Sequence, residues 1–194
     1  MSKSPETPVT AEELAAALPH VLAAPREEGI ITLLCARPKP NARAYPDHLT
    51  LTRAHGVAGD FEMSRPWLVL PDGSPDPRNQ VSIMPSRVLD LVWRERDRIA
   101  HPGDNIAVDM DLSEANLPVG TLLQVGTAIL RVSDEPNDGC AKWKVRCGRA
   151  AFDWVAARTH RPLRLRGLFC SIEQDGEVRL GDRIRRVGNG GSHA

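Results

Sequence analysis

The sequence lacks several features that mark specialised classes of protein. No apolar run approaches the ~20 residues that a membrane-spanning helix needs, so no membrane partner is expected. Residues 1–10 have neither the basic region nor the apolar core of a secretory signal. Aromatic residues make up only 4% of the chain, yet 41% hydrophobic and 26% charged residues are typical of a folded globular protein. We therefore expect a cytoplasmic globular protein.

An excess of charge of one sign is also absent, because 25 Lys and Arg balance 25 Asp and Glu. A neutral chain has no long-range attraction for nucleic acid, so no nucleic-acid partner is expected. The charge is unevenly distributed, however, and the segment between residues 140 and 166 is locally cationic. Its only acid is Asp153, while its basic residues are Lys142, Lys144, Arg146, Arg149, Arg158, Arg161, Arg164 and Arg166.

Pairs of cysteines or histidines at the spacing of zinc ligands are absent as well. There is no Cys-x-x-Cys pair and no His-x-x-x-His pair, which are the usual spacings of zinc ligands. The glycine loop at residues 55–60 lacks the Lys-Ser/Thr ending of a phosphate-binding loop, and turn chemistry explains it more simply. In a chain of this size without a secretory signal, the four cysteines are expected to be thiols rather than disulfides.

What is present is a series of short β-rich segments separated by turns. The expected strands are residues 30–36, 48–53, 80–84, 105–109, 121–125, 128–133, 165–172 and 177–185. Gly126-Thr127 predicts a tight hairpin, and Asp175-Gly176 predicts a turn between the last two strands whose glycine takes positive φ. No regular alternation of strand and helix appears. The fold class is therefore expected to be mixed α/β, mainly β: a β-barrel with a few peripheral helices.

Helices are expected at three places. Thr10 and Glu13 form a capping box ahead of a helix that runs to about Ala24 and that Pro19 bends or ends early. Residues 85–99 and 152–160 show helical spacing of apolar side chains. The predicted organisation is a helical extension over residues 1–28, a barrel domain over residues 29–187 and a flexible tail over residues 188–194.

Cys140 is the cysteine that we expect to be reactive. It follows a polar, glycine-containing segment, residues 134–139, and basic residues flank it, which favours the thiolate that attacks electrophiles or binds soft metals. Most free cysteines are small buried hydrophobes, and Cys35 and Cys170 fit that description because they lie in apolar strands. Cys147 is either a resolving thiol for Cys140 or a buried residue, and the second interpretation is favoured.

In their order along the chain, several motifs resemble the MOSC domain, named for the C-terminal part of molybdenum cofactor sulfurases. They are residues 56–60 (GVAGD), 80–83 (QVSI), 103–106 (GDNI), 119–126 (VGTLLQVG), the loop with Cys140, residues 166–168 (RGL) and residues 176–182 (GEVRLGD). The resemblance covers roughly residues 29–186. It implies a MOSC-type β-barrel whose cysteine either supplies a thiolate to molybdenum in a pterin cofactor (molybdopterin) or carries sulfur, without pyridoxal phosphate.

The resemblance also implies roles for individual residues. Cys140 would be the catalytic residue and metal ligand, and Asn105 falls at the family's Gly-Glu-Asn site, where this chain has Asp104 in the middle position. The cofactor carries an anionic phosphate and dithiolene, so fixed cations are needed, and arginine suits phosphate best. The residues that we expect to contact the cofactor are Asn105, Lys142, Arg146, Arg166, His55 and Arg53.

Three functions remain open at this point. The first is a molybdenum-dependent oxidoreductase that reduces N-hydroxylated small molecules. Since the sequence has no iron–sulfur cysteine set and no flavin fingerprint, it would need an external electron donor, such as a reductase or an iron–sulfur or flavin protein. The second is a sulfur carrier or cofactor-delivery module that holds a persulfide on Cys140 and receives sulfur from a donor. The third is a binding domain without catalysis.

Overall fold

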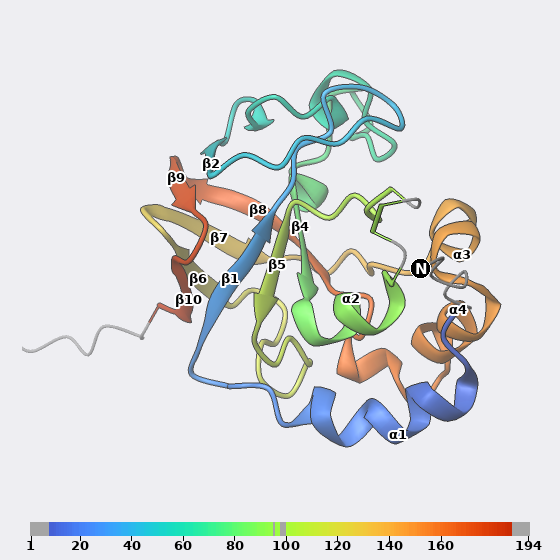
Figure 1. Cartoon of the computed structure of the whole chain (residues 1–194). Helices are drawn as coiled ribbons and strands as arrows, with labels where there is room; N and C mark the ends of the chain where they lie inside the picture. Colours follow the sequence, from blue (N-terminus) through green and yellow to red (C-terminus); the bar gives the residue numbers. More distant parts are fainter. Residues whose placement is uncertain (1–7, 95, 98–99, 188–194) are drawn as a thin grey trace, which may run out of the picture.

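The computed structural model describes residues 8–94, 96–97 and 100–187, and it contains a closed β-barrel with helices packed outside it (Figure 1). The order of strands around the barrel is β1-β10-β6-β7-β8-β4-β5. Their bounds are β1 Glu28–Leu34, β4 Val81–Pro85, β5 Ile106–Asp109, β6 Leu122–Val125, β7 Ala128–Val132, β8 Leu168–Gln174 and β10 Arg183–Arg186. The predicted class, a mainly β barrel with peripheral helices, is confirmed.

The remaining strands form a small separate sheet with the order β3-β2-β9. These strands are β2 His48–Thr52, β3 Gly56–Val57 and β9 Gly176–Arg179. The helices are α1 Ala11–Leu22, α2 Ser86–Val92, α3 Ala141–Cys147 and α4 Arg149–Ala156, with short 3-10 turns η1 Glu62–Ser64, η2 Pro77–Asn79 and η3 Arg161–Leu163. In Figure 1, α3 and α4 lie on the opposite side of the barrel from β2 and β9. Among the described residues, no helix has the length and apolar character needed to cross a bilayer.

Strand β4 connects the two hydrophobic cores of the molecule. It pairs in parallel with β5 and antiparallel with β8, and all five of its residues are buried. Val81 and Ile83 belong to the barrel core, whereas Met84, on the other face, belongs to a second core beneath the helices. A strand that is covered on both faces needs a nearly continuous apolar sequence, which residues 81–85 provide. Before β8, Gly167 has a φ of +95° and passes so close to β4 that an added Cβ would lie 2.1 Å from the Ile83 carbonyl oxygen.

Helix α1 contributes to the second core through Leu14 and Val21. The predicted capping box is confirmed, because the Thr10 hydroxyl accepts from the Glu13 amide and the Glu13 carboxylate accepts from the Thr10 amide. Pro19 does not end the helix early, since α1 continues to Leu22. Residues 1–7 of the predicted extension and the predicted tail at residues 188–194 lie outside the described part of the chain.

Two of the predicted helices have different bounds in the structure. The helix expected over residues 85–99 stops at Val92, because Trp93 leaves the helical conformation and packs its ring against His101, with ring centroids 4.9 Å apart. Ile99, the expected end of that helix, lies outside the described residues. The helix expected over residues 152–160 is α4, which begins earlier, at Arg149, and ends earlier, at Ala156. Helix α3 precedes it, over residues for which no element was predicted.

The last predicted strand is in fact two strands. Residues 177–185 are split into β9 and β10 at Gly181, whose φ of +86° breaks the extended backbone. The predicted turn with positive φ at Gly176 is wrong, because β8 and β9 belong to different sheets and Gly176 is not among the residues with positive φ. A glycine is needed there for another reason: an added Cβ would lie 2.5 Å from the Ala128 backbone nitrogen. The Gly126-Thr127 hairpin is confirmed by the pairing of Val125 with Ala128.

Candidate functional site

Cys140 lies at the N-terminal boundary of α3 and is exposed to solvent. The other three cysteines, which all fall within the described residues, are buried, as the sequence predicted. Burial raises the pKa of Cys35 and of Cys147 to about 12 and also raises the pKa of Cys170. At neutral pH these buried groups are therefore thiols. Cys140 is the sulfur that an external electrophile or metal can reach.

A loop of residues 101–105 (His101, Pro102, Gly103, Asp104, Asn105) is the centre of a group of arginines. Arg43 Nε donates to the His101 carbonyl at 3.0 Å, and Arg146 Nη1 donates to the Pro102 carbonyl at 3.2 Å. Arg166 Nη1 donates to Asp104 Oδ1 at 2.7 Å. The loop thus joins residues of α3 and of the segment before β8 to the segment after β1. Two of the predicted cofactor contacts, Arg146 and Arg166, meet here.

Gly103 makes the close approach of the arginines possible. Its φ is +112°, and an added Cβ would lie 2.9 Å from Arg43 Nη2 and 3.3 Å from Arg37 Cδ. Arg37 and Arg43 are themselves brought together by a bridge in which the backbones of Ala36 and Ala44 exchange two hydrogen bonds. Neither arginine was predicted from the sequence. Their approach depends on this fold-back and on the 101–105 loop, which lies far away along the chain.

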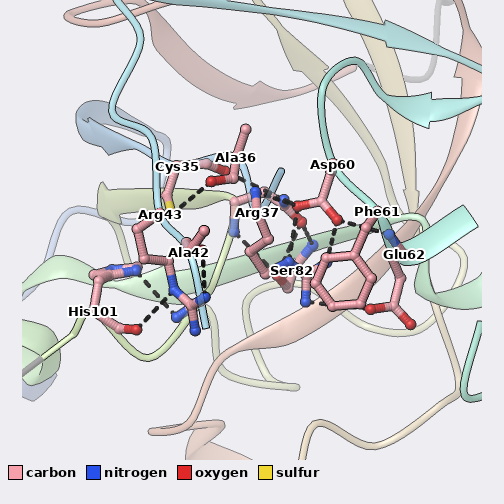
Figure 2. Close-up of polar contacts among 12 residues, drawn as sticks. Cys35, Ala36, Arg37, Ala42, Arg43, Asp60, Phe61, Glu62, Ser82 and His101 are labelled. Atoms are coloured by element: carbon pink, nitrogen blue, oxygen red, sulfur yellow. Dashed lines mark hydrogen bonds and ion pairs between the residues drawn. The ribbon is translucent and has the colours of Figure 1, made fainter. Parts of the chain in front are cut away.

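Arg37 is neutralised by carboxylates, which Figure 2 shows beside it. Its Nε donates to Asp60 Oδ2 at 2.8 Å and its Nη2 donates to Asp60 Oδ1 at 3.0 Å, while Glu62 lies 3.4 Å from Nη1. Burial raises the pKa of the Glu62 carboxyl, although the Arg37 charge opposes that shift. The Gly-Asp corner of residues 56–60 therefore provides a buried acid that positions an arginine. The sequence indicated only a turn there.

Asn105 uses its whole side chain to hold the same region together. Its Oδ1 accepts from the Ser82 amide and the Ser82 hydroxyl, each at 3.0 Å. Its Nδ2 donates to the Cys35 carbonyl at 3.3 Å and to Asp60 Oδ2 at 3.1 Å. An amide can make four such bonds, and all four are made within the protein. The side chain thus links the end of β1, strand β4 and Asp60 at the base of the arginine group.

Arg43 and Arg146 differ from Arg37 and Arg166, because neither forms an ion pair with any residue that the structure describes. Among the residues that the structure describes, the Arg43 side chain bonds only to the carbonyls of Ala42, His101 and Pro102. Burial, together with the like charge of Arg146, lowers the pKa of the Arg43 guanidinium. Two neighbouring cations without a carboxylate partner make a region that favours an anion.

His101 is completely buried beside these arginines. Its Nδ1 accepts from the Gly103 amide at 3.1 Å, so the proton of the neutral ring is on Nε2, which has no hydrogen-bond partner among the described residues. The ring makes edge contacts with Trp93 and Tyr45. Burial lowers the pKa of His101 to about 4, so the ring is neutral at pH 7 and adds no charge to the site.

The other predicted contacts lie elsewhere or lack partners. Arg53 and His55 follow β2 in the small sheet, where Arg53 pairs with Asp175 at 3.3 Å and His55 is exposed. The structure does not bring them to the 101–105 loop. Lys142 is exposed on α3, two residues after Cys140. Within the described ranges, no three His, Cys, Asp or Glu side chains gather in a way that could hold a metal ion.

Comparison with family models identifies the family, and comparison with solved structures shows a similar fold. A family model described as the MOSC domain matches residues 71–185, more than half of the chain. Among solved structures, YiiM from Escherichia coli is 17% identical, with a TM-score of 0.52 over 81% of this chain and 69% of its own. The YUAD protein from Bacillus subtilis is 18% identical, with a TM-score of 0.52 over 81% of this chain and 94% of its own. A structure described as a hypothetical protein is 21% identical, with a TM-score of 0.54 over 83% and 68% of the two chains. No curated protein sequence matches.

Proposed function

The chain belongs to the MOSC domain family, and from that premise we propose that it binds the molybdenum cofactor, with the Cys140 thiolate as a metal ligand, and reduces N-hydroxylated compounds. One observation carries the proposal. The exposed Cys140 is the N-cap of α3, the helix that carries Arg146, and Arg146 forms no ion pair with any described residue and is adjacent to Arg43. The start of α3 therefore supplies a soft ligand and its last turn supplies a cation without a carboxylate partner among the described residues, and an anionic cofactor that brings a soft metal needs both.

The residues present fit such a cofactor. Arg43 and Arg146 would hold its phosphate, and Gly103 lets Arg43 pack directly against the 101–105 loop, since an added Cβ there would lie 2.9 Å from Arg43 Nη2. Arg166 is fixed by Asp104 and by the Trp143 ring, which lies 5.5 Å from its guanidinium carbon. In this proposal Asn105 acts as a positioning residue, since its four hydrogen bonds keep the base of the site in place.

When bound, the cofactor would supply a two-electron centre. Two electrons and two protons convert an N–OH group into N–H and release water, so the reaction consumes reducing equivalents from an external donor protein. The protein's own residues bind and orient. Cys140 would hold the metal and the arginines would hold the phosphate, while the uncharged His101 leaves the positive charge to the arginines.

Metal analysis of the full chain, purified from a host that makes the cofactor, tests this proposal. We expect near-stoichiometric molybdenum in the wild-type protein and in Val145→Ala, which changes an exposed residue of the same helix. Cys140→Ser should lose the metal and the reduction of N-hydroxylated substrates while keeping its thermal stability. Molybdenum retained at the wild-type level in Cys140→Ser would refute the role of Cys140.

A second candidate function is a sulfur carrier, which the solvent exposure of Cys140 also favours, because a persulfide must be reachable by a partner protein. Intact-protein mass spectrometry separates the two. A labile gain of one sulfur on Cys140 in protein without molybdenum supports the carrier, and its absence refutes it. If neither molybdenum nor sulfur is found, a binding domain without catalysis is the remaining function.

A further inference from the structure

The outward face of α3 carries the most exposed large apolar side chain in the described part of the chain. Val145 is 84% exposed, whereas none of the other large apolar side chains there exceeds 57%. Trp143 and Cys147, two positions before and after it, are buried in the second core. Residues two apart point to nearly opposite sides of a helix, so the face with Val145 points away from the protein. In Figure 1, α3 lies at the outer edge of the molecule.

The charged groups nearest to Val145 on this helix are cations. Lys142 is exposed and Lys144 is half-buried, and neither forms an ion pair with a residue that the structure describes. Between residues 139 and 152 the sequence contains no acid. Lys142, Lys144 and Val145 are called the α3 surface below. It combines an exposed apolar side chain with positive charge that no described carboxylate neutralises.

The α3 surface suits an acidic protein better than a nucleic acid or a lipid membrane. Protein interfaces have an apolar centre and a polar rim, and opposite charges on the two partners speed their association. Nucleic acid is held through many phosphate contacts, and a membrane surface attracts clusters of about 4–8 cations, whereas the α3 surface has only its two lysines. A partner that presents carboxylates around a small apolar contact is complementary to it.

The α3 surface is also close to Cys140. Cys140 is the N-cap of α3, and Val145 follows it by five residues. With a rise of 1.5 Å per residue, the two residues are separated by about 8 Å along the helix axis. In the proposed function, the metal held by Cys140 receives its electrons from a separate protein. A donor seated on Val145 would bring its redox centre close to that metal.

We infer that the α3 surface is the docking site of an acidic iron–sulfur protein of the ferredoxin type, with Val145 at the centre of the contact and the two lysines facing carboxylates. The inference rests on the proposed function. Conversion of N–OH into N–H and water takes two electrons and two protons, so two reduced ferredoxin molecules are each oxidised by one electron per turnover. Such redox encounters have small interfaces, which a helix of about two turns can provide.

Binding of oxidised plant-type [2Fe–2S] ferredoxin to the full chain, measured by calorimetry at low ionic strength, tests the inference. We expect Val145→Asp to weaken binding about tenfold or more, because it replaces the apolar centre by a charge that repels the carboxylates of the partner. Val145→Lys should weaken binding less, since its charge has the favourable sign. High salt should weaken binding to the wild type.

Leu180→Asp is the matched control. Leu180 is 51% exposed and follows β9, which lies on the other side of the barrel from α3 (Figure 1), so this variant should bind ferredoxin as the wild type does. Equal affinities of Val145→Asp and Leu180→Asp, or no binding to the wild type, would overturn the inference. Thermal melts of all variants show whether each is folded, and Val145→Lys replaces Val145→Asp in the comparison if the latter is not.

Turnover of an N-hydroxylated substrate is measured on the same samples with two donors, reduced ferredoxin and reduced methyl viologen, a small molecule that needs no docking surface. In Val145→Asp, turnover with ferredoxin should fall while turnover with viologen and molybdenum content stay at the wild-type level. Absence of turnover with viologen in the wild type would refute the proposed function, whereas the calorimetry decides the docking site independently of catalysis.

Discussion

Replacing Asn105 by alanine should destabilise the protein more than the loss of a single hydrogen bond would. The side chain is 1% exposed and makes four hydrogen bonds, to Ser82, Cys35 and Asp60. Truncation removes the shared acceptor of the Ser82 amide and hydroxyl. It also removes the donor to a carboxylate that otherwise faces Arg37. We expect the change to act on folding first and on cofactor binding as a consequence.

The size of the effect follows from these bonds. A buried donor that loses its acceptor costs about 1–3 kcal/mol, and each remaining bond contributes about 1 kcal/mol. The free energy of unfolding should therefore fall by about 4–6 kcal/mol. Asn116→Ala is the matched comparison, because Asn116 is also 1% exposed but only donates, to the carbonyls of Arg26 and Asp111. Its loss should be about 2 kcal/mol.

Urea unfolding followed by circular dichroism measures both variants at one pH and temperature. With a slope of about 2 kcal/mol per molar urea, the midpoint of Asn105→Ala should lie about 2–3 M below that of the wild type, and that of Asn116→Ala about 1 M below. Equal losses in the two variants would refute the assignment of Asn105 as the residue that joins β1, β4 and Asp60.

Three further predictions address the thiols, a buried histidine and two glycines. At pH 8, iodoacetamide should modify Cys140 well before Cys147, whose pKa is about 12, and comparable rates by peptide mass spectrometry would contradict the structure. The pKa of His101 in the folded state, about 4, lies below its ordinary value of 6.5. Between these pH values the unfolded state binds a proton on His101 that the folded state does not, so the stability falls as the pH decreases from 6.5 toward 4. His101 should account for a loss of stability on the order of 3 kcal/mol over this pH range. Urea midpoints of His101→Phe should lack that loss, and a pH profile equal to that of the wild type would argue against the role of His101. Gly167→Ala should lower the melting temperature far more than Gly181→Ala, because both glycines have positive φ but only an added Cβ at Gly167 would meet a backbone oxygen. The Gly181→Ala change should cost only about 1–2 kcal/mol of stability. Equal shifts of the melting temperature in the two variants would disprove this difference.

Local signals in the sequence were sufficient for most of the barrel strands and for α1, whereas β10 was merged with β9 into one predicted strand. Thr10 and Glu13 are three residues apart, so a capping box depends on nothing distant, and it forms as predicted. The Gly126-Thr127 hairpin is likewise decided by a dipeptide. Elements that depend on packing were predicted less well. The helix after β4 ends at Val92 because the Trp93 ring packs against His101, and no local sequence pattern predicts that contact.

For the site, the sequence indicated Cys140 and the cationic stretch that contains Arg146 and Arg166, since basic residues adjacent to a cysteine can be read locally. It did not indicate Arg37, Arg43 or His101. These side chains gather only after the chain folds back at Ala36 and Ala44 and the 101–105 loop comes to lie beside them. The sequence around an isolated arginine does not predict whether a carboxylate will form an ion pair with it in the folded protein. That difference distinguishes Arg43 from Arg37 and emerges only in three dimensions.

The small β3-β2-β9 sheet has a consequence for self-association. A closed barrel has no free edge strand, whereas this sheet has two outer edges on which another extended chain could in principle add. One edge is β3, only two residues long. The other, β9, is covered where the Thr127 amide donates to the Glu177 carbonyl at 2.9 Å. Neither edge offers a long template, so addition of another strand to this sheet is disfavoured.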